Sequence, residues 1–254
     1  MPFRYPSLRN GLPIAGYYAR LDAGATVEDR FTAGSTQNGT LRNGAIRTDN
    51  SGLAYFFDGS NDDCSFGVNA FGSALSGATA STVSLWINYS SLVGTSGQFV
   101  NVVFSTRFTS NLAALSFNIR SDTGFVGRPQ FGGRSQSSDS FQSVTAGSAL
   151  TAGTWAHVAA VMNYTADTIT IYLNGSATSA NVSFGSNTYV SSTGTLNDVM
   201  GGNDNTVFYN GFIDDLLIWP RALTATEIGY LALRRGVIYE RSAGGIPAVL
   251  MEVV

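Results

Sequence analysis

One stretch near the end of the chain constrains the fold more than any other: residues 208–231, with the sequence FYNGFIDDLLIWPRALTATEIGYL. Its first half, residues 212–219, consists largely of β-branched, aromatic and large aliphatic residues, which favours a strand. Apolar residues adjoin one another there instead of strictly alternating with polar ones. This pattern predicts either a strand covered on both faces or a strand with a β-bulge near residues 214–215. Pro220, which has no backbone N–H group, ends the strand.

A short helix is predicted directly after this strand. Thr224 is placed to act as the N-cap residue, and Glu227, three positions later, completes a capping box. Gly236 is expected at the C′ position, and residues 234–235, both arginine, are expected in the last helical turn, where cations interact favourably with the helix dipole. The sequence therefore predicts one short C-terminal helix that ends close to residue 235.

Much of the remaining chain reads as strands separated by turns. Residues 83–89 alternate between the two faces of a strand: Val83, Leu85 and Ile87 lie on one face, and Ser84, Trp86 and Asn88 lie on the other. Such alternation is typical of a strand that buries one face in a sandwich. Other segments of this kind follow at the regular spacing of a meander or jelly roll.

Several segments of the sequence resemble laminin G-like, concanavalin A-like lectin/glucanase domains in their order and spacing. The most specific is GFIDDLLIWPRALTATEI, and the others precede it: residues 56–63, 82–87, 155–161 and 169–175. The resemblance implies an all-β fold over residues 12–235, a two-sheet antiparallel jelly-roll β-sandwich of the concanavalin A-like type with one short C-terminal helix. A fold of this kind hosts many unrelated activities, so the resemblance implies little about function.

The composition excludes some classes of protein. Charged residues make up 12% of the chain, about half of the usual share of ~25%, so Ser, Thr, Asn, Gln and Gly are expected to form much of the surface. The net charge of −3 and the sequence pI of about 5.0 argue against nucleic-acid binding. Because Cys64 is the single cysteine, no intrachain disulfide can form.

The two ends of the chain are expected to lie outside the sandwich. Residues 1–11 are predicted to form an N-terminal arm, which packs either on its own sandwich or on a neighbouring subunit. Residues 236–254 are predicted to form a C-terminal tail that ends in an apolar run. The tail is expected either to extend its own sheet or to dock on a partner, and the partner is favoured because the sandwich is complete before it. We find no signal peptide and no apolar run of the ~18–20 residues needed to span a membrane. No membrane partner is therefore expected. The chain is also expected to form a homo-oligomer.

Catalysis is not expected from the sequence. His157, the sole histidine, lies within a predicted strand, and no nucleophile-elbow motif supplies a serine for it, so we interpret it as structural. The laminarinase-like branch of the superfamily places two glutamates and an aspartate on one strand, whereas this chain has no Glu-x-Asp run. Its glutamates are Glu28, Glu227, Glu240 and Glu252. The chain is therefore predicted not to be an enzyme.

A calcium site is the one metal site for which the sequence offers candidate ligands. Asp58, Asn61 and Asp62 lie in one predicted turn, Asp214 lies in the closing strand, and calcium prefers oxygen ligands of this kind. The resemblance adds that related sandwiches often hold calcium near such acids. The alternative is that Asp58 and Asn61 form Asx turns and that Asp214 pairs with Arg221. The sequence leaves both open.

Two further features bear on ligand binding. Residues 134–148, rich in Ser, Gln and Gly, are predicted to form a long exposed loop, which serves either as a ligand-binding rim or as a simple connection. Exposed aromatic side chains would provide a platform for sugars, and the candidates are Tyr89, Phe141, Tyr189 and Tyr209.

Two functions from different classes fit these observations. The first is a non-catalytic virion structural protein of a bacteriophage, a capsid decoration or cement subunit or a fibre-associated one, whose arm and tail contact other capsid subunits. It rests on the absent signal peptide, the low charge and the resemblance of residues 233–240 to laminin G-like proteins of tailed phages. Its expected location is the virion, after assembly in the host cytoplasm. The second is a carbohydrate-binding, lectin-like module that contacts glycans through rim loops, with calcium assisting.

Overall fold

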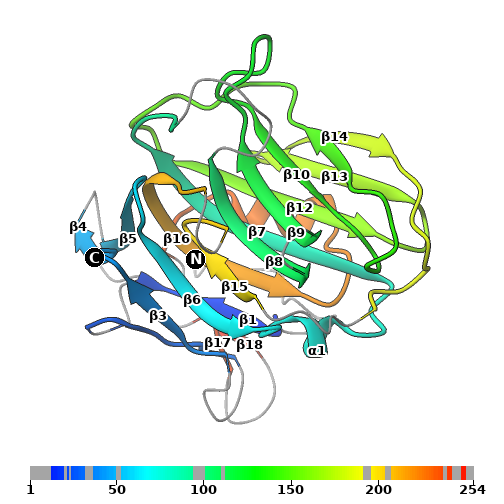
Figure 1. Cartoon of the computed structure of the whole chain (residues 1–254), viewed down its shortest axis with the longest axis horizontal. Coiled ribbons are helices and arrows are strands. Elements are labelled where there is room, and N and C mark those ends of the chain that lie inside the picture. Colours follow the sequence, from blue (N-terminus) through cyan, green and yellow to red (C-terminus); the bar gives the residue numbers. More distant parts are fainter. Residues whose placement is uncertain are drawn as a thin grey trace, which may run out of the picture.

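A computed structural model of the chain describes residues 13–19, 22, 24–31, 37–49, 53–93, 101–109, 112–190, 196–203, 207–236, 239–241 and 247–249. Over these residues the chain forms two eight-stranded antiparallel sheets that pack face to face (Figure 1). This architecture confirms the predicted all-β sandwich. Two short helices accompany the sheets, α1 (Gly72–Leu75) and α2 (Ala225–Leu231), and α2 is the predicted C-terminal helix.

The strand order places segments that are far apart in the sequence side by side. The first sheet has the order β14-β13-β12-β7-β16-β5-β4, and β1 also pairs with β16. Its strands are β1 (Ala15–Tyr17), β4 (Ile46–Asp49), β5 (Leu53–Asp58), β7 (Ala80–Tyr89), β12 (Ala156–Asn163), β13 (Thr168–Leu173), β14 (Ser176–Asn181) and β16 (Asn210–Trp219).

The second sheet has the order β11-β10-β9-β8-β15-β6-β3-β2. Its strands are β2 (Thr26–Val27), β3 (Gly39–Arg42), β6 (Asp63–Val68), β8 (Val102–Thr109), β9 (Leu112–Ile119), β10 (Pro129–Gly133), β11 (Gln142–Thr145) and β15 (Asn197–Met200). This sheet lies in front of the first sheet in Figure 1.

The main hydrophobic core lies between the two sheets, and a smaller one lies on the outer face of the first sheet. The alternation predicted for β7 is confirmed, because Val83, Leu85 and Ile87 are buried in the main core. The smaller cluster joins β12 and β16 to α2 and to residues near the N-terminus: Tyr18, Phe31, Ala159, Val161, Tyr172, Leu217, Trp219, Leu223, Ile228 and Leu231. Helix α2 therefore covers part of the outer face of the first sheet.

Strand β16 is covered on both faces and also carries the predicted bulge. Leu216 and Ile218 lie in the main core, while Leu217 lies in the outer cluster. The register with β7 shifts between Asp214 and Leu217, and Asp215 has φ +49°. A bulge inserts one extra residue and re-aims the side chains beside it. As a result, both aspartates reach residues that follow α2.

The N-terminus of α2 agrees with the prediction, and its C-terminus does not. The Thr224 hydroxyl accepts the Glu227 N–H at 3.2 Å, and the Glu227 carboxylate accepts the Thr224 N–H at 2.8 Å, which confirms the capping box. The helix ends at Leu231, so the expected end near residue 235 is wrong, and Gly236 is not its C′ residue. Because β16 binds residues 235–236, this segment follows the sheet and leaves the helical path.

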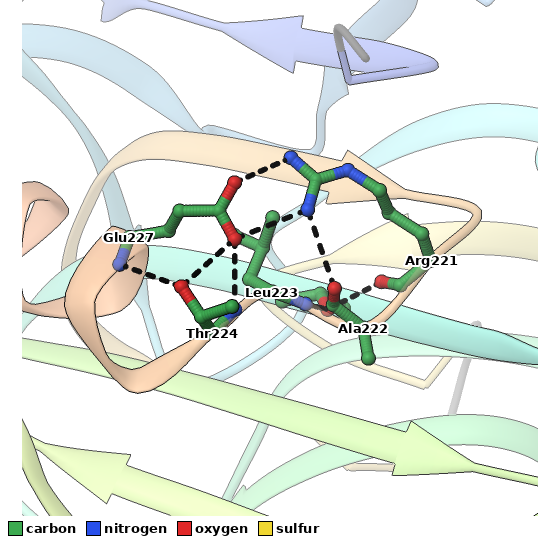
Figure 2. Close-up of polar contacts among 6 residues, drawn as sticks. Arg221, Ala222, Leu223, Thr224 and Glu227 are labelled. Carbon is green, nitrogen blue, oxygen red and sulfur yellow. Dashed lines mark hydrogen bonds and ion pairs between the residues drawn. The ribbon is translucent and has the colours of Figure 1, made fainter. Parts of the chain in front are cut away.

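Side-chain contacts fix the corner between β16 and α2 (Figure 2). Arg221 donates through both terminal nitrogens to the Glu227 carboxylate, at 3.1 and 2.8 Å. Thr82 of β7 donates its hydroxyl to the Arg221 carbonyl at 2.7 Å and accepts the Leu223 N–H at 3.1 Å. The corner is thus tied to a neighbouring strand as well as to itself, and this sets the position of α2 over the sheet.

The predicted arm, residues 1–11, lies outside the described residues. Within the predicted tail, β17 (Tyr239–Arg241) and β18 (Pro247–Val249) pair with each other in a separate two-stranded sheet. Docking of the arm or the tail on a partner therefore stays a prediction. No helix among the described residues is long and apolar enough to cross a membrane.

Candidate functional site

A small pocket lies on the outer face of the first sheet, beside the C-terminal end of α2. It is shallow and open to solvent, and its cavity volume is about 10 Å³, roughly the room of one water molecule. Its walls come from three adjacent strands, from α2 and from the segment after the helix: Ser84 and Trp86 of β7, His157 of β12, Asp215 and Leu217 of β16, Leu231 of α2, and Arg234. The pocket therefore combines aromatic, hydroxyl, imidazole, carboxylate and guanidinium groups.

The register of the strands explains how these side chains meet. On β7, Ser84 and Trp86 occupy the face opposite to the buried Val83 and Leu85. Trp86 is the Cα partner of His157 on one side and of Asp214 on the other. Three neighbouring strands thus present outward side chains at the same level of the sheet, as alternation along antiparallel strands requires.

His157 and Ser84 are the most deeply buried polar residues of the pocket. The His157 side chain is almost inaccessible, and its Nε2 lies 2.9 Å from the Ser84 hydroxyl. Its Nδ1 has no hydrogen-bond partner in the described part of the chain. Burial lowers the pKa of His157 to about 3, so the imidazole is neutral at physiological pH. A neutral imidazole has one donor and one acceptor nitrogen, and Nδ1 is the nitrogen that none of these contacts uses.

Trp86 contributes the aromatic surface. It is half-buried, and its ring centroid lies 5.5 Å from that of His157 with an interplanar angle of 64°. In this edge-to-face arrangement the imidazole braces the indole and fixes its orientation. A preorganised aromatic surface stacks on a ligand ring with little further loss of side-chain entropy.

The two carboxylates of the bulge hold the polar wall of the pocket in place. Asp214 is fully buried, and its carboxylate lies 3.0 Å from Nη1 of Arg235. The guanidinium of Arg235 lies 4.0 Å from the centroid of the Trp155 ring, in a cation–π contact. Asp215 accepts the N–H of Gly236. These contacts anchor the segment that carries Arg234 to the pocket.

The Ser84–His157 contact corrects one part of the sequence interpretation. His157 does lie within a strand, but the structure also places a serine beside it and makes it part of a pocket. In a Ser-His-Asp triad a carboxylate accepts a hydrogen bond from Nδ1–H and supports the imidazole as a general base. Here Nδ1 has no such partner in the described residues, and a pKa of about 3 makes the ring a poor base near neutral pH. The Ser84–His157 pair is therefore suited to forming hydrogen bonds and poorly suited to transferring protons.

The four predicted calcium ligands do not meet at one place. Asp58 lies opposite Asn210, whereas Asp214 is four residues further along β16, roughly 13 Å away at about 3.3 Å per residue. Within the described ranges, no three or more His, Cys, Asp or Glu side chains form a group that could hold a metal ion. The pairing expected between Asp214 and Arg221 is also wrong, because Asp214 pairs with Arg235.

The other three candidates remain together in the turn between β5 and β6. Asp58 forms an Asx turn by accepting the Ser60 N–H at 2.7 Å. Asp62 is buried and accepts the Asp58 N–H at 3.0 Å, and burial raises the pKa of its carboxyl. The Asn61 carbonyl accepts an amide hydrogen of Asn43 at 3.0 Å. These bonds account for the turn, and calcium binding there stays a prediction.

The structure places the four aromatic candidates in different environments. Tyr189 and Tyr209 are buried in the main core, so their expected role as a sugar platform is wrong. Tyr89 and Phe141 are half-buried. Residues 142–145 form edge strand β11, so the loop expected over residues 134–148 is shorter than predicted. Trp86 was not among the candidates for a sugar platform that were predicted from the sequence. Its position on the outward face of the strand at residues 83–89, with Ser84 and Asn88, could have indicated it.

Comparison with known proteins identifies the superfamily. The family model described as "Concanavalin A-like lectin/glucanases superfamily" matches residues 58–229. No curated protein matches the sequence.

Solved structures share the fold. Domain 4 of AbnA, a GH43 extracellular arabinanase from Geobacillus stearothermophilus solved in complex with arabinotriose, has a TM-score of 0.64 at 18% identity, over 87% of this chain and 98% of that one. The binding domain of botulinum neurotoxin DC in complex with SialylT has a TM-score of 0.60 at 15% identity, over 87% of this chain and 50% of that one. A sialidase of Trypanosoma rangeli has a TM-score of 0.59 at 15% identity, over 87% of this chain and 33% of that one.

The chain thus spans about half of the toxin structure and a third of the sialidase. At these identities the likeness to solved structures shows the fold alone. The family match covers most of the sandwich, including the strand–helix unit of β16 and α2. The chain therefore belongs to the concanavalin A-like lectin/glucanases superfamily.

Proposed function

We propose that this protein is a non-catalytic, lectin-like module that binds glycans on the surface around the pocket beside α2. A sugar offers an apolar face of C–H groups and a rim of hydroxyls that both donate and accept hydrogen bonds. The observation that carries the proposal is the partly buried Trp86 next to three polar groups of different kinds: the neutral imidazole of His157, the carboxylate of Asp215 and the guanidinium of Arg234. Ligand sites commonly combine apolar surface with a few well-placed polar groups.

The comparisons support the same class of ligand. The arabinanase domain was solved with arabinotriose, and one toxin binding domain was solved with SialylT. Because one fold hosts many functions, the support for this chain comes from the pocket, and the relatives only raise the expectation.

A glycan array with matched variants tests the proposal. Wild-type protein is expected to bind a defined set of glycans, and Trp86→Ala is expected to lower the affinity for those glycans at least roughly tenfold, which corresponds to about 1.4 kcal/mol. Phe125→Ala is the control, since Phe125 is a partly exposed aromatic residue in the connection between β9 and β10. Repeating the array with a chelator tests calcium assistance. Absence of glycan binding by the folded wild-type protein would falsify the proposal.

A role as a virion structural protein is a second proposal, from a different class, and it rests on the sequence alone. It rests on the absent signal peptide, the low charge, the arm, the apolar tail and the resemblance of residues 233–240 to phage proteins. Residues 1–11 and most of 236–254 lie outside the described residues. Its test is separate from the pocket: deletion of residues 242–254 is expected to abolish assembly or particle binding. Glycan binding and assembly are compatible, because a surface subunit can also adhere to glycans.

A further inference from the structure

A row of aromatic side chains lies on the outer face of the first sheet, next to the pocket. Phe212 of β16 and Phe56 of β5 are Cα partners, and their ring centroids lie 4.9 Å apart. The Trp155 ring, just before β12, lies 6.4 Å from that of Phe212. Beyond Phe56, its partner Ile46 on β4 is 50% exposed. We call the three aromatic residues Trp155, Phe212 and Phe56, together with the aliphatic Ile46 at their end, the aromatic row.

The aromatic row is not part of either hydrophobic core. Its three rings are half-buried, and none of them belongs to the core between the sheets or to the cluster under α2. Their sequence neighbours Phe57 and Ile213 point the other way, into the main core. Because alternation sends the row outward, packing against the opposite sheet does not explain these large apolar side chains. A row of this kind on one face indicates a binding surface.

The row and the pocket form one continuous surface. Phe212 is the Cα partner of Asn88, and Trp86 lies two residues before Asn88 on β7. Trp86 and Phe212 are therefore diagonal neighbours on the same face, at a separation of about 7–8 Å. Arg235 links the two areas, since it contacts the Trp155 ring and pairs with Asp214.

We propose that the ligand is a neutral oligosaccharide whose terminal residue lies over the mouth of the pocket, beside Trp86, and whose following residues lie along the aromatic row toward β4. This inference rests on the proposed function and names the ligand class of the same site. The rings of Trp86, Phe212 and Phe56 offer apolar surface to successive sugar rings, as aromatic side chains do for the successive bases of a single strand. The Trp155 ring is already in contact with the Arg235 guanidinium and borders this surface. A neutral ligand is favoured because the two charged residues that line the pocket, Asp215 and Arg234, are opposite in sign, so the pocket wall offers no net positive charge to a ligand carboxylate, and the guanidinium of Arg235 is engaged by Asp214.

The test compares chain lengths and ring positions. Neutral linear oligosaccharides of increasing length, including an arabinan series, and matched sialylated glycans are titrated by calorimetry against wild type, Phe212→Leu, Phe56→Leu and Trp86→Ala. Leucine keeps apolar volume while it removes the ring, and Phe125→Leu is the control in the connection between β9 and β10. Thermal unfolding verifies that each variant is folded. Affinity for wild type is expected to rise with chain length, and the Phe212 and Phe56 variants are expected to lose roughly tenfold for long chains and little for the shortest sugar.

The outcomes separate the two proposals. Binding of glycans that does not strengthen with chain length, or that is unchanged in both row variants, overturns the extended site and leaves the pocket function intact. Preferential binding of sialylated glycans overturns the neutral ligand. A change of oligomeric state in the row variants with unaltered glycan binding assigns the row to contact between copies and also overturns the inference. If wild type binds no glycan of any length, the proposed function itself fails.

Discussion

Asp214 and Asp215 are adjacent in the sequence, yet both carboxylates bind the segment that follows α2: Asp214 pairs with Arg235, and Asp215 accepts the N–H of Gly236. On a regular strand adjacent side chains point to opposite faces. The bulge at Asp215, with φ +49°, removes that alternation at this one place. The two acids thereby tie α2 and its downstream segment to the sheet and shape the polar wall of the pocket.

Asp214→Asn is expected to destabilise the protein strongly. Asp214 is fully buried and Arg235 is 11% exposed, so the substitution leaves a cation without its buried counter-charge, at a cost of about 3–5 kcal/mol. Urea unfolding measures the effect. Glu28→Gln is the matched control, because Glu28 forms an ion pair with Arg30 but is half exposed, and such pairs contribute about 1 kcal/mol or less. Equal, small effects of both substitutions would contradict the assigned role of Asp214.

Thr224→Ala is expected to weaken α2 through loss of the capping box. The Thr224 hydroxyl accepts the Glu227 N–H at 3.2 Å, and removal of an N-cap side chain costs about 0.5–2 kcal/mol. Thr224→Ser keeps the acceptor and is expected to retain nearly full stability. Chemical denaturation of both variants checks this, and a serine variant as unstable as the alanine variant would show that packing, not capping, is at work.

Gly211→Ala is expected to be more damaging than Gly77→Ala. Both glycines have positive φ, +148° and +80°, so alanine is strained at either position. A Cβ at Gly211 would lie 2.4 Å from the Asn88 carbonyl oxygen, whereas nothing lies within 4 Å of one at Gly77. The Gly77 variant is expected to lose about 1–3 kcal/mol from backbone strain. The Gly211 variant is expected to lose more, because β16 must separate from β7. Thermal unfolding ranks the two.

His157 is expected to make stability depend on pH. Its folded-state pKa is about 3, below the ordinary value of 6.5, so the unfolded state binds the proton first as the pH falls. The stability associated with neutral His157 is complete above about pH 6.5 and is lost progressively toward pH 3. His157→Gln removes this dependence. The stability advantage of wild type over the variant is expected to shrink by about 2–3 kcal/mol between neutral pH and about pH 4.5. A difference that stays constant across this range would count against the assignment.

Asp198 is expected to act in the opposite direction. It accepts the N–H groups of Phe71 and Arg107, at 3.0 and 3.1 Å, but burial raises its pKa to about 7 from the ordinary 3.8. The folded state therefore binds the proton more tightly, and the associated stability, complete below about pH 4, is lost as the pH rises through 7. Relative to Asp198→Asn, wild type is expected to lose about 4 kcal/mol over this range. Unfolding at several pH values, compared with His157→Gln, separates the two opposite slopes.

The strand–helix unit was predictable because its signals are local. Side-chain alternation, the capping box and the bulge depend on residues close together in the sequence, and each was found where expected. The end of α2 was not predictable, because contacts of Asp214 and Asp215 with residues 235–236 override the local preference for more helix. Tertiary contacts routinely override propensity in this way.

The pocket was harder to predict than the fold, because it depends on register. Ser84 and His157 are 73 residues apart, and only the pairing of β7 with β12 places them on one face. The sequence identified His157 and placed Trp86 on the polar side of its strand, but nothing local related the two. The calcium candidates show the same dependence on register. Asp214 was grouped with the acidic residues of the β5–β6 turn because both supply carboxylates, but the pairing of β16 with β5 places Asp214 away from that turn.

The position of β16 has a consequence for biosynthesis. This strand, residues 210–219, lies between β7 and β5, which precede it by more than a hundred residues. While the ribosome is still adding those residues, both neighbours expose unpaired edges, and such edges recruit other nascent chains into aggregates. The last large strand to emerge therefore joins the two parts of the first sheet. A truncated or stalled chain lacks this strand and leaves the edges of β7 and β5 unpaired and prone to aggregation. The sheet can form only when synthesis of the polypeptide is nearly complete.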